Sequence, residues 1–142
     1  MKRLITSFII LLLTMISLYL YCMYYDWGND IDIYELDSGI QGPCLLIVAG
    51  THGNEPSGRI TVERWLYENK NNLPRKGKIY IIPRANKSGS HLHFRYMLHN
   101  LLHPDLNRNY TDTGKDPVSQ KIISLVRDKK IDFILDFNEG WG

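Results

Sequence analysis

The stretch "CLLIVAGTHGNEPSG", residues 44–58, changes character abruptly in its middle. Its first part, Cys44–Ala49, is apolar without interruption, which is typical of a strand buried on both faces in the interior of an α/β sheet. Its second part places His52 and Glu55 among glycines and is followed by Pro56, which suits the first turn of a helix. The stretch therefore predicts a strand, a loop and a helix, with two chemically capable side chains beyond the strand's carboxyl end, where such sheets bind ligands.

Strand and helix patterns alternate along the rest of the chain. A period-two pattern predicts a short edge strand over Ile31–Leu36, and Gly42-Pro43 separates it from Cys44. The remaining predictions are a helix from Pro56 to Lys70, a strand over Lys78–Pro83, a long polar and irregular segment over Arg84–Tyr110, a helix from Asp116-Pro117 to Lys130, and a strand over Ile131–Phe137. This order indicates an α/β fold with a mostly parallel, mixed sheet flanked by helices.

An uncharged segment, Leu4–Tyr25, follows Lys2 and Arg3 at the beginning of the chain. At about 1.5 Å per residue, a helix of this length crosses a bilayer core of about 30 Å. Tyrosines and Trp27 gather at its far end, as in an interfacial aromatic belt. The segment lacks the small residues of a cleavage site, which favours an uncleaved signal-anchor over the alternative of a secreted protein. With the two basic residues inside, the rest of a single-pass membrane protein is extracytoplasmic.

Composition narrows the class of protein. The 142 residues suit one domain, and the net charge of +2 comes from scattered Lys and Arg, so no nucleic-acid partner is expected. Cys22 and Cys44 form no disulfide framework, and Cys44 is interpreted as a small buried hydrophobe. We divide the chain into a transmembrane segment (1–25), a linker with an edge strand (26–42) and a catalytic-domain part (43–142).

His52 and Glu55 are the first candidate site residues. Imidazole nitrogen and carboxylate oxygen are the ligand pair of many catalytic zinc sites. The alternative is a polar loop histidine beside a helix-capping glutamate. A phosphate-binding loop is excluded, because no Gly-Lys-Ser/Thr follows the glycines.

Two further segments carry candidate side chains. Asn107 and Arg108 are adjacent in the long polar loop, where the guanidinium can hold a carboxylate through two parallel hydrogen bonds. The alternative is an ordinary surface arginine. The strand that ends at Phe137 delivers Asn138 and Glu139 directly at its carboxyl end.

Taken together and in this order, "GTHGNE", "IIPRAN", "DLNRNY" and "ILDFNEG" resemble the zinc carboxypeptidase superfamily, and most closely its succinylglutamate desuccinylase/aspartoacylase branch. The resemblance runs from Leu45 to the last residue. It implies that His52 and Glu55 bind zinc, and that Asn107 and Arg108 hold a substrate carboxylate or polarise its carbonyl. The implied reaction is attack of metal-activated water on an amide or ester bond near a carboxylate, in a small molecule or a peptide.

The sequence departs from the family pattern at two places. The family reads Asp-Leu-His-Glu where this chain has Asn138, so a neutral amide replaces the histidine that is the third zinc ligand. We therefore expect Asn138 to be a poor third ligand and zinc to bind weakly. The family's general-base glutamate lies downstream of this motif. The chain thus resembles the front part of a catalytic domain, with a sheet that is incomplete at its C-terminal side and an uncovered apolar edge.

Several residues keep two interpretations. Arg95 is either the family's additional carbonyl-polarising arginine or a loop residue, and Asp136 either orients a metal ligand or faces solvent. His91 and His93 are either substitute ligands or solvated loop residues. For the whole chain, the alternative to a zinc hydrolase is a degenerate, inactive, membrane-anchored relative that acts as a binding protein or has no activity.

Overall fold

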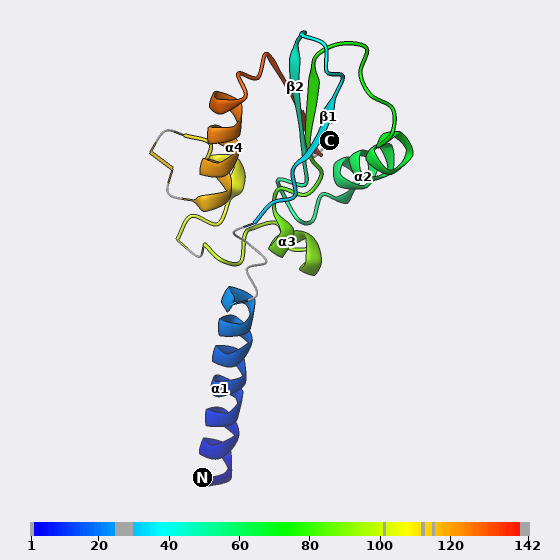
Figure 1. The fold of residues 1–142 in the computed structure, drawn as a ribbon. Coiled ribbons are helices and arrows are strands. Elements are labelled where there is room, and N and C mark those ends of the chain that lie inside the picture. Colours follow the sequence, from blue (N-terminus) through cyan, green and yellow to red (C-terminus); the bar gives the residue numbers. More distant parts are fainter. Residues whose placement is uncertain (1, 25–29, 101, 112, 115, 140–142) are drawn as a thin grey trace.

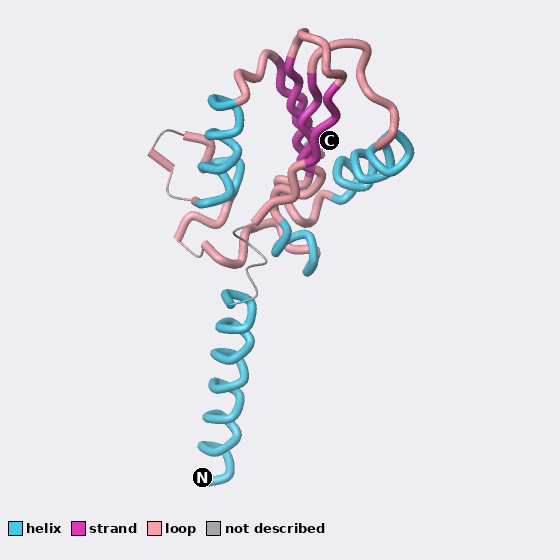
Figure 2. The backbone as a smooth tube through the Cα atoms, in the orientation of Figure 1, coloured by secondary structure: helices cyan, strands magenta, loops and turns pink. Residues whose placement is uncertain are grey.

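The computed structural model describes residues 2–24, 30–100, 102–111, 113–114 and 116–139. Figures 1 and 2 show a small sheet with helices beside it. The elements, in chain order, are α1 (Lys2–Tyr24), β1 (Tyr34–Asp37), β2 (Cys44–Ala49), α2 (Pro56–Asn69), β3 (Lys78–Ile82), α3 (Lys87–Leu92), a 3-10 helix (Leu106–Arg108), α4 (Pro117–Asp128) and β4 (Phe133–Phe137).

The four strands form one mixed sheet in the order β1-β3-β2-β4. β2 pairs in parallel with both β3 and β4, while β1 pairs antiparallel with β3. The predicted α/β class with a mostly parallel sheet is confirmed. The predicted edge strand exists, but it begins at Tyr34 rather than Ile31.

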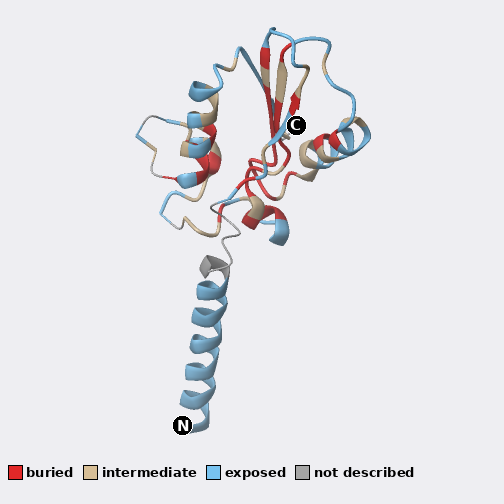
Figure 3. Ribbon diagram, in the orientation of Figure 1, coloured by how far each residue is buried: buried red, intermediate tan, exposed pale blue. Residues whose placement is uncertain are grey.

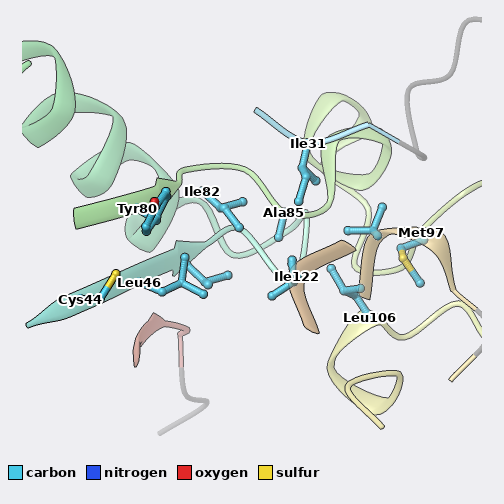
Figure 4. Packing of buried hydrophobic residues seen from close by; sticks show 11 residues of the cluster. Ile31, Cys44, Leu46, Tyr80, Ile82, Ala85, Met97, Leu106 and Ile122 are labelled. Carbon is cyan, nitrogen blue, oxygen red and sulfur yellow. The ribbon is translucent and has the colours of Figure 1, made fainter. Parts of the chain in front are cut away.

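The helices cover both faces of this sheet because β2 is apolar on both of its sides. Leu46 and Val48 join a core cluster with Val118 and Ile122 of α4 (Figure 4). The alternate residues of β2 join a second cluster with α2, which contains Ile47, Ala49, Val62 and Leu66. Accordingly, α4 and α2 lie on opposite sides of the strands in Figure 1.

The long polar segment Arg84–Tyr110 is more ordered than the sequence predicts. It contains α3 and the 3-10 helix, so the expectation of an irregular segment is wrong for those residues. Side-chain caps explain both short helices, since Asn86 accepts a hydrogen bond from the Gly89 N–H and Asp105 accepts one from the Asn107 N–H. Both caps are local hydrogen bonds that leave no hydrophobic periodicity in the sequence.

β4 lies at one edge of the sheet that the described residues form, and its partner there is β2. All five of its residues, from Phe133 to Phe137, are exposed. Elsewhere the sheet contains many buried residues, which are red in Figure 3. Within the described part of the chain, the predicted uncovered apolar edge is therefore present.

α1 agrees with the predicted apolar helix in its extent. Lys2–Tyr21 is long and apolar enough to cross a membrane, by length and composition alone. Tyr25 and Trp27, which belong to the predicted aromatic belt, lie outside the described residues.

Candidate functional site

A sharp turn directs the chain from β2 into the candidate site. Gly50 adopts a positive φ of 69°, and a Cβ atom there would lie 3.3 Å from the Arg84 Cα. A hydrogen bond connects the turn to the segment after β3, because the Asn86 N–H donates to the Gly50 carbonyl at 2.9 Å. His52 therefore lies just beyond the carboxyl end of β2, where the sequence predicts it.

His52 and Glu55 meet in a buried position. They are only 4% and 7% exposed, and His52 Nδ1 lies 3.0 Å from Glu55 Oε1. The direction of this contact is not that of a hydrogen bond, so Nδ1 has no hydrogen-bond partner among the described residues. Buried polar atoms are normally paired, so a lone nitrogen facing a carboxylate oxygen needs an explanation.

Asp105 supplies the other partner of His52, at 3.1 Å between Asp105 Oδ1 and His52 Nε2. With the proton on Nε2 donated to Asp105, Nδ1 carries the lone pair that a metal ion would use. Carboxylates orient metal-binding histidines in this way. Asp105 was not predicted as a site residue, although it directly precedes Leu106-Asn107-Arg108. Asp136 was the carboxylate for which an orienting role was considered.

The charge state of Glu55 suits a metal ligand. Burial raises the pKa of the Glu55 carboxyl, but the contact with His52 and the hydrogen bond from Arg95 outweigh burial and hold the pKa below its ordinary value. Arg95 Nη1 donates to Glu55 Oε1 at 2.5 Å. The structure thus brings Arg95 to the pair, 40 residues from Glu55 along the chain.

These residues fit two of the three protein positions of a zinc site. Donors about 2.0–2.1 Å from a tetrahedral ion lie roughly 3.3 Å apart, close to the observed 3.0 Å between Nδ1 and Oε1. Among the residues that the structure describes, no group of three or more His, Cys, Asp or Glu side chains could hold a metal ion. The arrangement therefore supplies two strong donors and leaves the third position to a weaker one.

The end of β4 presents Asn138 and Asp136 to solvent. Asn138 Nδ2 donates to Asp136 Oδ2 at 2.7 Å. Partial desolvation of the carboxyl and the charge of Glu55 raise the pKa of Asp136, and the hydrogen bond from Asn138 and the nearby His52 offset only part of the rise. Asp136 thus contacts Asn138, the residue for which the family resemblance predicts the third ligand position.

Asn107 and Arg108 lie in the 3-10 helix immediately after Asp105. The backbone N–H of Asn107 donates to Asp105 Oδ1 at 3.0 Å, and the Arg108 side chain is exposed. The two residues are therefore attached to the same loop that holds His52.

The other four histidines differ in their surroundings. His91 and His93, at the end of α3, are exposed, and so is His103. His99 Nε2 instead lies 3.0 Å from Oδ2 of the buried Asp116.

The sequence matches, over residues 41–138, the family model described as the succinylglutamate desuccinylase/aspartoacylase catalytic domain. No curated protein sequence matches the chain.

Among solved structures, the chain is similar to an aspartoacylase family protein from Mesorhizobium loti (TM-score 0.63, 25% identity), covering 76% of this chain and 34% of that one. It is also similar to tripeptide-bound cell shape determinant Csd4 from Helicobacter pylori (TM-score 0.63, 27% identity), covering 80% of this chain and 28% of that one. A metallo-carboxypeptidase from Pseudomonas aeruginosa, in complex with (2-guanidinoethylmercapto)succinic acid, shares the fold (TM-score 0.66, 18% identity, covering 80% and 32%). The chain thus spans about a third of the length of these proteins.

Proposed function

Because the chain belongs to the succinylglutamate desuccinylase/aspartoacylase catalytic-domain family, we propose that it is a zinc-dependent hydrolase that cleaves an amide or ester bond near a carboxylate. The observation that carries the proposal is the buried pair of His52 Nδ1 and Glu55 Oε1, 3.0 Å apart. Asp105 contacts the other ring nitrogen, Nε2, and so holds the imidazole in an orientation that leaves Nδ1 available to a metal.

In this proposal His52 and Glu55 hold zinc, and Asn138 takes the third position through its amide oxygen. When bound, zinc lowers the pKa of a coordinated water and polarises a carbonyl. The low pKa of Glu55 keeps its carboxylate ionised at neutral pH, as a ligand must be. Asn138 donates to Asp136 through Nδ2 and can offer a metal only its neutral amide oxygen, so zinc binding is weak.

The basic side chains bind the substrate. Arg108 presents an exposed, forked guanidinium that pairs with a carboxylate through two hydrogen bonds, assisted by Asn107. Arg95, already beside Glu55, lies where it can hydrogen-bond the carbonyl under attack. A peptide or a carboxylate-bearing small molecule is the substrate class, and the tripeptide bound to the similar protein Csd4 supports it.

A second candidate function is a degenerate relative that binds such a ligand without turnover. The specific observation in its favour is Asn138, because its side chain is exposed and hydrogen-bonded to Asp136. A chain with only two strong donors would hold zinc too weakly for catalysis at cellular metal concentrations.

Zinc titration of the full chain in detergent micelles, against the Asn138→His variant, separates these two functions. We expect weak binding by the unmodified chain and at least about 10-fold tighter binding by the variant, the lower limit for losing even an outer partner of a metal. Asn72→His is the matched control, since it adds an imidazole at an exposed position after α2. Circular dichroism must first show that all three proteins fold.

The outcomes have distinct meanings. Hydrolysis of N-acyl amino acids by the unmodified chain with zinc supports the enzyme. Hydrolysis by Asn138→His alone, or zinc binding that only this variant shows, identifies the degenerate relative. Absence of zinc binding in both proteins refutes the metal site, and equally tight binding in both means that another residue completes it.

We also propose that α1 is an uncleaved anchor that leaves the domain outside the cytoplasm, and that residues 26–42 link it to the domain. The apolar length of Lys2–Tyr21 supports this assignment. Carbonate extraction of membranes and N-terminal sequencing test it, and a soluble product that begins near residue 26 would refute it.

A further inference from the structure

The N-terminus of α2 is capped by a residue from the far end of the sequence. The N-cap residue of α2, Glu55, makes no capping hydrogen bond with its own side chain. Instead, Glu139 Oε1 accepts a hydrogen bond from the Ser57 N–H at 2.5 Å and another from the Ser57 hydroxyl. A carboxylate at this place satisfies an N–H group that the helix itself leaves free, and it interacts favourably with the helix dipole.

The backbone of Glu139 makes a second contact with the same turn. Its N–H donates to Glu55 Oε2 at 3.2 Å. Glu55 Oε1 is the oxygen that faces His52 and Arg95. The two oxygens of Glu55 are therefore distinguished, because one is held by Glu139 and the other is directed toward the lone nitrogen of His52.

A glycine shows independently that the first turn of α2 packs closely against the end of β4. A Cβ atom on Gly58, in the first turn of α2, would lie 2.5 Å from the Phe137 carbonyl oxygen. Any larger residue at position 58 would push α2 away from the end of β4. The short distance is thus a property of the packing and does not depend on Glu139 alone.

From these contacts we propose that Glu139 is a positioning residue for the metal ligand Glu55. Its carboxylate stabilises the first turn of α2 by accepting hydrogen bonds from Ser57. Its N–H donates to Glu55 Oε2 and so orients the Glu55 carboxylate with Oε1 near His52 Nδ1. The same contacts fix the backbone of Asn138, which directly precedes Glu139. The inference rests on the proposed function, since it assigns Glu139 a role toward the metal that His52 and Glu55 hold.

The test uses the full chain in detergent with Asn138→His as the background, so that zinc affinity is measurable. Glu139→Ala removes the carboxylate, while Glu139→Gln keeps an oxygen that can accept from Ser57. Glu68→Ala is the matched control, because Glu68 lies on the same helix and its exposed ion pair with Arg64 is remote from these contacts.

Two readouts are combined. Amide hydrogen exchange at Ser57, measured without metal, reports the hydrogen bond directly, and zinc affinity reports the orientation of Glu55. For Glu139→Ala we expect exchange to accelerate about 10-fold or more, as for a lost hydrogen bond to a charged group, and zinc affinity to fall about 10-fold. Glu139→Gln should recover a large part of both losses, and Glu68→Ala should change neither.

Each contrary result is informative. Unchanged exchange at Ser57 in Glu139→Ala would refute the contact itself. Faster exchange with unchanged zinc affinity would reduce Glu139 to a helix cap and overturn its positioning role. If the background binds no zinc while exchange responds as expected, then the proposed function has failed, and the positioning role with it, although the cap is real.

Discussion

Two neighbouring parallel strands end at the candidate site, and they end differently. β2 is covered on both faces, and the His52 and Glu55 side chains beyond it are buried with polar partners around them. β4 is exposed along its whole length, and Asn138 beyond it contacts Asp136 in an exposed position. The difference shows that the half of the site contributed by the covered strand is preorganised, whereas the half contributed by the edge strand is open.

Burial explains why the two ends differ. A polar group that is removed from water needs a protein partner, so the buried residues after β2 are held in fixed orientations. The exposed side chain of Asn138 can exchange its protein partner for water at little cost. A substitution is therefore tolerated more easily at position 138 than at position 52, which agrees with the neutral amide found there.

The largest expected effect compares two leucines, one from each strand. Leu46 in β2 is 0% exposed, whereas Leu135 in β4 is 49% exposed. Leu46→Ala should lower the free energy of unfolding by about 2–5 kcal/mol, the range for fully buried leucines, and Leu135→Ala should lower it by less than about 1 kcal/mol. Urea denaturation of the full chain in detergent measures both. Equal losses would mean that β4 is covered as well as β2 is.

The next largest effect is expected when the residue after β2 and the residue after β4 are compared as metal ligands. His52→Ala removes an imidazole whose two nitrogens both face carboxylates, and it should weaken zinc binding about 100-fold. Asn138→Ala removes a weak donor and should change zinc affinity by no more than about threefold. Isothermal titration calorimetry of the two variants measures this difference. A larger loss for Asn138→Ala would reverse the ranking of the two strands.

A smaller effect concerns Asp116, at the start of the helix α4 that packs against β2. Asp116 is buried at the N-terminus of α4, where it accepts from the Ser119 N–H and contacts His99 and Asn100. Burial raises the pKa of the Asp116 carboxyl, but these three partners outweigh burial and lower it beneath its ordinary value of 3.8.

Because its folded pKa is the lower one, Asp116 stabilises the fold fully above about pH 4, and this contribution is lost as the pH falls through the folded pKa. The Asp116→Asn variant should lose about 1–2 kcal/mol at pH 7 and show a shallower decline toward pH 3. Urea midpoints of the two proteins between pH 6 and pH 3 test this. Parallel curves would show that Asp116 contributes no pH dependence.

Much of the fold could be predicted from local signals. The limits of β2, Cys44–Ala49, agree with the sequence prediction because an apolar run ends at a glycine that needs a positive φ. The start of α4 was predicted from Asp116-Pro117 for an equally local reason. By contrast, α3 and the 3-10 helix are too short for hydrophobic periodicity, and only their capping side chains mark them.

The candidate site was predictable only where its residues are close in sequence. His52 and Glu55 are three residues apart, and their pairing follows from the turn that carries them. Asp105 lies 53 residues from His52, and Glu139 lies 82 residues from Ser57. Such partners are brought together by the sheet order, which no local pattern encodes.

The order of the strands also determines how the domain can fold while it is being synthesised. β2 is central in the sheet but early in the chain, and its register joins Leu45 to Phe133 of β4. In a nascent chain, the edge of β2 that pairs with β4 therefore has no partner strand until residue 137 has left the ribosome. Contacts of such long sequence separation form slowly, and exposed strand edges favour aggregation in the meantime. The edge of β2 is thus open to aggregation in the nascent chain until β4 is in place.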